Sequence, residues 1–551
     1  MGYGQSVSGE KPKKMEITME MGEVSSPGVS GAANLLGAGG HRVRSGAYLL
    51  FSWVLNPTDQ KQPEEIDVTR MALTVAAGFG GLVALVVAYR KQRDAEEGRF
   101  VERFGAAAEQ LGHVDVAVRM AGVYAMAGVA DRTRNMEQRQ QCVDVLCGYL
   151  RLPYDPTSIE DHQVLTIVRN PEREGTSTSR EIHFQYRQND REVRNTIVRI
   201  ISDHLRRDDS QSWSQCSFDF KNVFFDNANF SGARFDGSIT SFEGATFGGA
   251  FTSFALVAFG SRRSSFVEAT FDANRTLFTG ATFDGTFTLF NLAKFSGEST
   301  LFEGARFGGG ETSFDRAMFD GEKTAFVWAM FGGKKISFLG ATFSGKETSF
   351  LGARFGGEST LFGGATFSGE STLFEGVMFG GGETSFDRAM FGGEKTSFDR
   401  AMFGGEKTSF LEARFGGEKT SFLEARFSGE KTSFLEARFS GKTTAFYMAT
   451  FSGAITLFDR AMFSGAITSF ERATFSGGKT SFYMTTFSGE KTAFYRATFS
   501  GLKIDFNHPQ QWNPAPKFDW DNPSSGILKP NNVKPGDWPP TEKHDPELGD
   551  S

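Results

Sequence analysis

The sequence is poor in the residues that build metal, redox and disulfide centres. Its 551 residues include three cysteines, Cys142, Cys147 and Cys216, an odd number without the Cys-x-x-Cys spacing of zinc and redox sites. Reduced thiols in a cytosolic compartment fit this usage best. None of the seven histidines falls within residues 213–506, and no two have metal-ligand spacing on a helix. We therefore expect no metal site, no cofactor and no catalytic residue, and predict that the chain is not an enzyme.

An excess of charge of one sign is also absent from the larger part of the chain. The formal net charge is −7, but residues 230–505 together carry only about −1, because neighbours such as Glu418 and Lys419 cancel. No basic stripe is available to follow a phosphate backbone, so we expect no nucleic-acid partner. The strongly acidic surface of a nucleic-acid mimic is missing as well.

Phenylalanine, in contrast, recurs without a break from Phe230 to Phe506 at alternating intervals of five and seven residues. A run spaced strictly by five, from Phe220 to Phe235, precedes it. Most of the chain's 59 phenylalanines fall on this ladder. Repeats with a fixed short period cannot bury their own apolar side and must stack on their neighbours. The sequence therefore predicts a solenoid with a phenylalanine core.

The repeating unit has twelve residues, as in TSFLEARFGGEK at 408–419. Threonine stands two residues before the first Phe of nearly every unit, and alanine two residues before the second. Alternate side chains of an extended segment face the same side, so we expect these small residues and the Phe rings to point inward. Gly-Gly or Ser-Gly in most units disfavours a helix.

Two consecutive pentapeptides in this unit, TSFLE and ARFSG at 432–441, resemble the repeats of the pentapeptide-repeat family. The resemblance covers roughly residues 216–506. It implies a mainly β chain, in which residues 213–506 form a right-handed quadrilateral β-helix. Two extra residues follow each second pentapeptide and indicate a bulged corner on every other side, with two units, or about 24 residues, per coil. At the strand spacing of ~4.8 Å the rod would be on the order of 55 Å long.

An uncharged segment precedes the repeats. Met71–Tyr89 contains nineteen residues without a charge, flanked by Arg70 and by Arg90, Lys91 and Arg93. Its length matches the ~30 Å hydrocarbon core of a bilayer, which predicts one transmembrane helix at 71–89; the alternative is a buried helix of a soluble domain. Basic residues crowd its C-terminal flank, so we expect the C-terminal bulk to be cytoplasmic and the protein to reside in the cell membrane. Residues 47–55 are apolar but short, and a second span there stays open.

The remaining segments are assigned by composition and periodicity. Residues 1–70 are predicted to be largely disordered, and residues 90–212 to be helical, with apolar side chains at helical spacing in 190–206. Phrases within 108–156 resemble a helical region of bacterial membrane-linked pentapeptide-repeat proteins. Residues 507–551 are rich in Pro and Asn and predict a partly disordered tail. We expect its first part to fold over the end of the rod, because an uncapped solenoid exposes unpaired strand edges.

These features favour a membrane-anchored scaffold that presents a rigid β-helical surface to an unidentified protein partner, without catalysis. The outward position after the first Phe holds large apolar residues in the C-terminal half, including Leu411, Leu423, Leu435 and Tyr447. In a coil of two units, 411 stacks on 435 and 423 on 447, giving two apolar columns. Such columns indicate either an interaction site or side chains that only stabilise the stack.

Two alternative functions and one further contact stay open. The family resemblance also implies a DNA-mimicking topoisomerase-binding protein, although the near-neutral rod argues against it. The threonine column suggests an extracellular adhesive or ice-binding solenoid, although threonines that face inward would not serve one. Five small residues recur every fourth position of the apolar segment, at Ala72, Ala76, Gly80, Ala84 and Ala88. Small residues let membrane helices approach closely, so this stripe predicts either a homodimer through the helix or pairing with residues 47–55. The alternative is that Ala and Gly are simply frequent in membrane helices.

Overall fold

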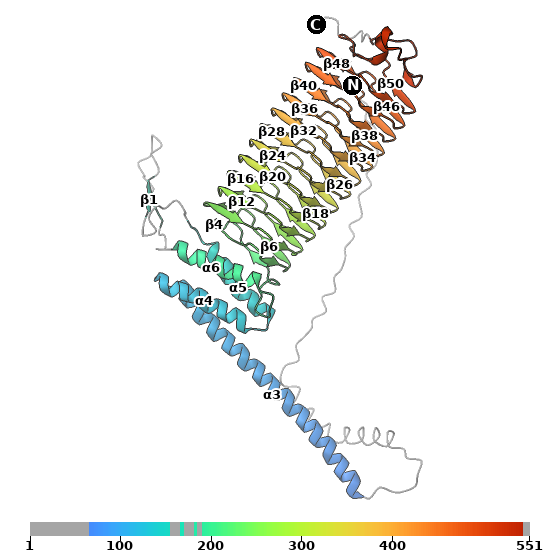
Figure 1. The fold of residues 1–551 in the computed structure, drawn as a ribbon. Helices are drawn as coiled ribbons and strands as arrows, with labels where there is room; N and C mark the ends of the chain where they lie inside the picture. The colour runs from blue at the N-terminus through green and yellow to red at the C-terminus, as the bar shows by residue number, and fades with distance from the viewer. Residues whose placement is uncertain (1–64, 155–165, 170–180, 185–189, 544–551) are drawn as a thin grey trace, which may run out of the picture. The chain divides into compact units, whose positions relative to one another are not determined.

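The computed structural model describes residues 65–154, 166–169, 181–184 and 190–543 (Figure 1). The marginal apolar segment 47–55 lies outside these residues, as does most of the N-terminal segment 1–70. The chain divides into two compact units, residues 1–93 and 94–551.

The first unit contributes the greater part of helix α3, Glu65–Gly112. Among the described residues it is the one helix that is long and apolar enough, by length and composition, to cross a membrane, over 74–112. No other described part of the chain covers its apolar side chains: Phe79 is 70% exposed and Leu85 71%. A helix of this kind is suited to serve as a membrane span or as a signal sequence.

The second unit is built around a parallel β-solenoid of about 12 coils, so the predicted mainly β, four-sided fold is confirmed. Each coil contributes one short strand to each of four sheets, and each strand pairs with the equivalent strand of the next coil, as in Arg263↔Phe287. The first coil is shorter, because Phe218 pairs with Thr240. That shorter coil matches the initial run of phenylalanines spaced strictly by five. The right hand of the coil stays a prediction.

The four sheets are numbered in the order in which a coil enters them, and each gains one strand per coil. The first sheet contains β3 (Phe218–Asp219), then three-residue strands from β6 (Ile239–Ser241) to β50 (Lys503–Asp505), and ends with β51 (Val533–Lys534). The second sheet contains β4 (Phe224–Asp226), then strands from β7 (Thr246–Gly248) to β47 (Thr486–Phe487).

The third and fourth sheets complete each coil. The third sheet contains strands from β8 (Phe251–Ser253) to β48 (Lys491–Ala493), each of three residues. The fourth sheet contains two-residue strands from β5 (Arg234–Phe235) to β49 (Thr498–Phe499). Outside the solenoid, β1 (Thr166–Arg169) and β2 (Glu181–Phe184) form an antiparallel pair.

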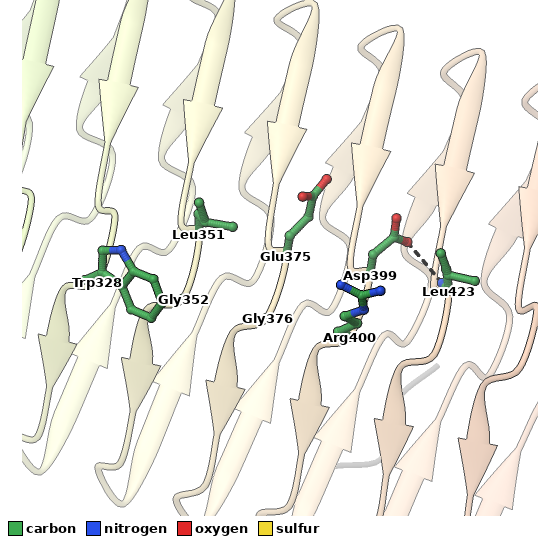
Figure 2. A pocket seen from close by; sticks show the side chains of 8 residues that line it. All are labelled: Trp328, Leu351, Gly352, Glu375, Gly376, Asp399, Arg400 and Leu423. Carbon is green, nitrogen blue, oxygen red and sulfur yellow. Dashed lines mark hydrogen bonds between the residues drawn. The ribbon is translucent and has the colours of Figure 1, made fainter.

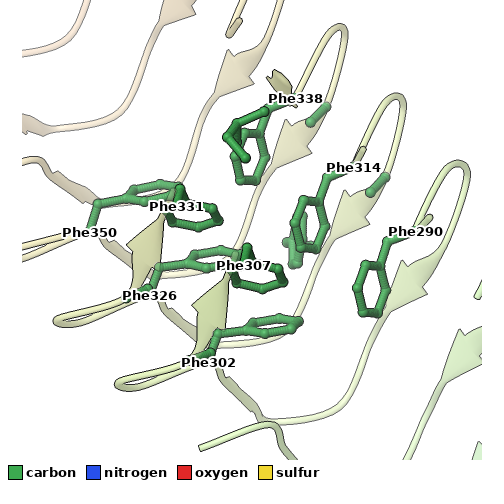
Figure 3. Close-up of a cluster of buried hydrophobic side chains, with 14 of the residues drawn as sticks. Phe290, Phe302, Phe307, Phe314, Phe326, Phe331, Phe338 and Phe350 are labelled. Atoms are coloured by element: carbon green, nitrogen blue, oxygen red, sulfur yellow. The ribbon is translucent and has the colours of Figure 1, made fainter. Parts of the chain in front are cut away.

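The core is the phenylalanine ladder (Figure 3). Rings of successive coils stack in parallel with their centres offset, as for Phe307 and Phe331 with centroids 4.7 Å apart, a spacing that follows from the strand repeat. Across the interior the rings meet edge to face, as for Phe326 and Phe338 at 5.8 Å and 89°. Both arrangements are favoured by the quadrupole of the ring. The predicted inward residues are buried too: Ala413 is fully buried and Thr408 is 2% exposed.

Two kinds of corner alternate around each coil. A tight turn joins the first sheet to the second, and the third to the fourth; in one of them the Ala413 N–H donates to the Phe410 carbonyl at 3.1 Å. The third residue of that turn, Glu412, has φ 55°. The two extra residues of the unit lie at the wider corners between the other sheets. There a Cβ on Gly417 would lie 1.7 Å from the Gly393 carbonyl oxygen, so glycine lets successive coils stack.

Two helices, α5 (Met136–Leu150) and α6 (Asp190–Arg206), cover the N-terminal end of the solenoid, and α4 (Val116–Arg132) packs against both of them. Asn135 caps α5 by accepting a hydrogen bond from the Glu137 N–H at 2.8 Å. Gln140 of α5 continues the pairing of the first strand, because its amide exchanges two 2.8 Å hydrogen bonds with the backbone of Ser217. The helical core and the phenylalanine core are continuous.

Residues 507–543 cover the C-terminal end. Strand β51 pairs with β50, and single bridges from Gln511 and Lys517 extend the second and third sheets. Phe518 stacks on Phe494 at 4.7 Å and so continues one column of the core. Three tryptophans, Trp512, Trp520 and Trp538, pack against this last layer. The cap thus removes most of the free strand edge that an open solenoid would present.

Candidate functional surface

Metal-binding groups and reactive thiols are the first candidates for a functional site among the described residues. No group of three His, Cys, Asp or Glu side chains among the described residues is arranged to hold a metal ion. The three thiols are buried where the helices meet the first coil. Burial raises the pKa of Cys142 to about 12 and that of Cys216 to about 11, so both are protonated and unreactive at neutral pH.

A polar cluster ties the helical cap to the solenoid. The Asp131 carboxylate accepts from Trp213 Nε1 at 3.1 Å and lies 3.1 Å from His204 Nε2. Burial opposes ionisation of Asp131, but the hydrogen bonds and charge of its neighbours outweigh burial and lower its pKa. The His204 and Trp213 rings stack at 4.0 Å. Because every polar atom of this cluster has a protein partner, we assign it a structural role.

The predicted apolar columns form as expected. Leu411 and Leu435 occupy equivalent turns of successive coils, since the N–H of Glu412 donates to the Leu435 carbonyl at 3.0 Å. Leu423 and Tyr447 are related in the same way through Glu424. These side chains are half-buried in the bend of the tight turns. The threonine column, in contrast, faces the interior, so the feature that suggested ice binding does not reach the surface.

A ladder of ion pairs runs along the tight turns and the neighbouring strands. Arg388 pairs with Glu412 at 3.1 Å and Arg400 with Glu424 at 3.0 Å, in each case one coil apart. A hydrogen bond from Arg388 lowers the pKa of Glu412. Each pair satisfies two turn charges within the rod, although exposed pairs of this type are screened by water and add little to stability. Most charged residues of these turns thus have an ion-pair partner within the rod.

A groove of about 340 Å³ interrupts the turns that join the third sheet to the fourth. It arises because two successive coils carry glycine, Gly352 and Gly376, where the coils before and after carry Trp328 and Arg400 (Figure 2). The Trp328 ring lies over Gly352, since a Cβ there would be 2.6 Å from the indole. Trp328 is nevertheless 63% exposed. The complete lining is Trp328, Leu351, Gly352, Glu375, Gly376, Asp399, Arg400 and Leu423.

The strands that follow this groove carry a row of arginine and methionine. The outward residue is the first of each strand in β17 (Arg306–Phe307), β21 (Met330–Phe331), β25 (Arg354–Phe355), β29 (Met378–Phe379), β33 (Met402–Phe403) and β37 (Arg426–Phe427). We call these six outward residues the Arg/Met row. Neither the groove nor the Arg/Met row was predicted from the sequence, although glycine at 352 and 376 was the available signal.

The comparisons add no relative to this description. No family model, curated protein or solved structure matches the chain. The parallel solenoid with stacked phenylalanines remains consistent with a pentapeptide-repeat fold.

Proposed function

We propose that the chain is a membrane-anchored scaffold without catalytic activity, which presents the outer surface of its solenoid to a protein partner. The observation that supports this function best is the regular surface itself. Equivalent outward side chains recur once per coil on a stack whose two ends are covered. Repeat proteins of this build use their extended faces for binding, because stacked coils hold outward residues at fixed spacing.

The anchor in this proposal is the apolar part of α3, residues 71–89. Its large side chains, such as Leu82 at 62% exposed, pack against no other described part of the chain. Arg90, Lys91 and Arg93 follow it, so the proposed topology is a single pass with the C-terminal bulk in the cytoplasm. The small residues along one face of the segment support a homodimer through this helix.

Membrane fractionation tests the anchor. The full-length protein should stay in the pellet after an alkaline carbonate wash, and a C-terminal tag should resist protease in sealed cells. Replacing both Leu82 and Leu85 with lysine should release the protein, because each charge at the centre of a span costs about 2.5–3.5 kcal/mol. A wild-type protein that washes off the membrane would contradict the proposal.

Crosslinking in cells tests the scaffold. A photo-crosslinking residue at Leu411 or Leu435 should give one reproducible adduct with another protein. The same residue at the fully buried Phe422 is the control and should give none. If outward positions on every sheet give no adduct, the scaffold function is wrong.

A further inference from the structure

The Arg/Met row is one face of the rod on which positive charge is left without a partner. In the described part of the chain, the side chains of Arg306, Arg354 and Arg426 make no ion pair and no hydrogen bond. This differs from the turn arginines Arg388 and Arg400, each of which binds a glutamate one coil away. The six outward positions of the row contain no acidic residue. The row therefore offers three free guanidinium groups on a rigid surface.

The row is also flat and partly apolar. The residue after each second Phe is glycine at Gly332, Gly356 and Gly380, and a Cβ at these positions would meet nothing within 4 Å. Met402 is 37% exposed, and Met330 and Met378 are half-buried. Methionine and arginine are enriched at protein interfaces, where the flexible thioether adapts to the partner.

The groove adjoins the row, because Gly352 and Gly376 each stand two residues before its outward residues Arg354 and Met378. Its carboxylates are already engaged: Glu375 pairs with Lys395 at 3.1 Å, and Asp399 accepts from the Leu423 N–H at 3.0 Å. What remains open is the face of Trp328 and the side of Leu351, so the groove suits an apolar side chain.

Trp328 adopts an unfavourable backbone conformation in this position. Its φ is 56°, while the equivalent turns before and after it use Gly304 and Gly352. The left-handed conformation is less favourable for a bulky residue than for glycine, because Cβ then approaches the following carbonyl oxygen. Because the indole is largely exposed, burial within the rod offsets only part of this cost. An exposed tryptophan beside free arginines has the composition of an interface hot spot.

We propose that the Arg/Met row and the groove together bind an amphipathic α-helix of a partner protein, with acidic residues facing Arg354 and Arg426 and an apolar residue against Trp328. This inference rests on the proposed scaffold function and names its partner. A helix parallel to the rod axis advances about 5.4 Å per turn, close to the ~4.8 Å between coils, so successive turns meet successive coils. Over six coils the mismatch stays at about 3 Å, which flexible Arg and Met side chains absorb.

The border of the row argues against a polyanion as the occupant. The corner that follows the fourth sheet carries Glu358, Glu406 and Glu430, against one lysine, Lys334, in the coils of the row. A nucleic acid or an anionic bilayer would place negative charge against these carboxylates as well as against the arginines. A helix with a narrow acidic stripe meets the arginines alone.

A peptide-binding assay on the full-length protein in neutral nanodiscs tests the site. The probe is a fluorescent helical peptide of about 20 residues with glutamate and leucine on one face at heptad spacing. The control peptide has the same sequence with lysine in place of each glutamate. We expect saturable binding of the acidic peptide only. Replacing Arg354 and Arg426 with glutamate should weaken binding at least about tenfold, since like charges then face each other. Trp328→Ala should weaken it as well.

The matched control is the same double replacement at Arg414 and Arg438, which hold the equivalent outward position on the second sheet. It should leave affinity unchanged, and thermal unfolding should show that both variants are folded. Equal binding of the two peptides, equal loss in the control, or row-dependent binding of vesicles containing phosphatidylserine would overturn the proposal. If the peptide fails while Leu411 still crosslinks to a protein in cells, this site is wrong and the scaffold function stands.

Discussion

Truncation of one core ring gives a direct measure of how the solenoid is held together. Phe422 is fully buried and lies between Phe398 at 4.9 Å and Phe446 at 4.7 Å in its own column. It also meets Phe410 and Phe434 edge to face. Removing a buried Phe side chain costs about 3–5 kcal/mol, and more when the site cannot collapse. Here the stacked rings are fixed by parallel pairing on both sides, so we expect Phe422→Ala to cost about 5 kcal/mol, at the upper end of that range.

The neighbouring residue supplies the control. Leu423 follows Phe422 in the chain but is half-buried at the surface of the tight turn. Its truncation removes less buried area and leaves no internal cavity, so Leu423→Ala should cost about 1 kcal/mol. The difference is measured by urea unfolding followed by far-UV circular dichroism, with hydrogen exchange of the adjacent coils as a local check. Equal costs at the two positions would refute the assignment of inward and outward faces.

Four further predictions address the corners, the two caps and the apolar segment of α3. Gly417→Ala should lower the free energy of unfolding by roughly 1–3 kcal/mol in chemical denaturation, because the added Cβ meets the Gly393 carbonyl. Gly416→Ala is the control and should be nearly neutral, because its Cβ meets only Ser440 Oγ at 3.7 Å. A neutral Gly417→Ala would show that the corner can shift. Deleting residues 507–551 should expose Phe494 and the free edges of β47 to β50, and the molecules should then associate end to end. Light scattering in detergent would detect this as an increase in mass. An unchanged mass would mean that the cap does not protect these edges. The pKa of Asp131 is lowered in the folded state, so its stabilising effect is present above the ordinary carboxyl pKa and is lost as pH falls below about 4. Asp131→Asn should therefore reduce stability at pH 7 and make acid unfolding, followed by Trp213 fluorescence, less dependent on pH. An unaltered acid unfolding curve would show that Asp131 does not have this role. Replacing Gly80 and Ala84 with isoleucine should abolish self-association in a membrane-helix reporter without affecting insertion, and an unchanged signal would leave the helix as a simple anchor.

The fold was predictable because one rule acts at every coil. Inward positions hold Phe, Ala and Thr in nearly every unit, with a few replacements such as Val257 and Ile336, and the interval between rings fixes the length of the coil. Even the shorter first coil could be recognised, since the strict spacing by five from Phe220 to Phe235 lacks the extra residues of one later corner. The sequence also indicated that the open end needs a cover, but not how the cover forms. The pairing of β51 with β50 joins Val533 to Ile504 across a long segment without any repeat pattern.

The boundaries of the long helix show a second limit of sequence reasoning. The uncharged segment ends at Tyr89, but α3 continues to Gly112 because Phe100, Phe104, Ala107 and Leu111 present one apolar face to the helical core. Charge sets the limits of a membrane span, whereas packing sets the limits of a helix. The uncharged segment and the packed face of α3 therefore end at different residues of one continuous helix.

The candidate surface could not be predicted because outward positions are not constrained by the core. Any side chain fits at the third residue of a tight turn, provided that the chain accepts φ near +55°, and the rod uses Gly352, Trp328, Arg400 and Glu424 there in one column. Glycine is the least strained choice, so each larger residue adds a cost that some other interaction must offset. For Arg400 and Glu424 the offset includes their ion pair. Within the described part of the rod, Trp328 has no comparable compensation beyond its contact with Gly352, and for this reason the search for a partner should begin at that turn.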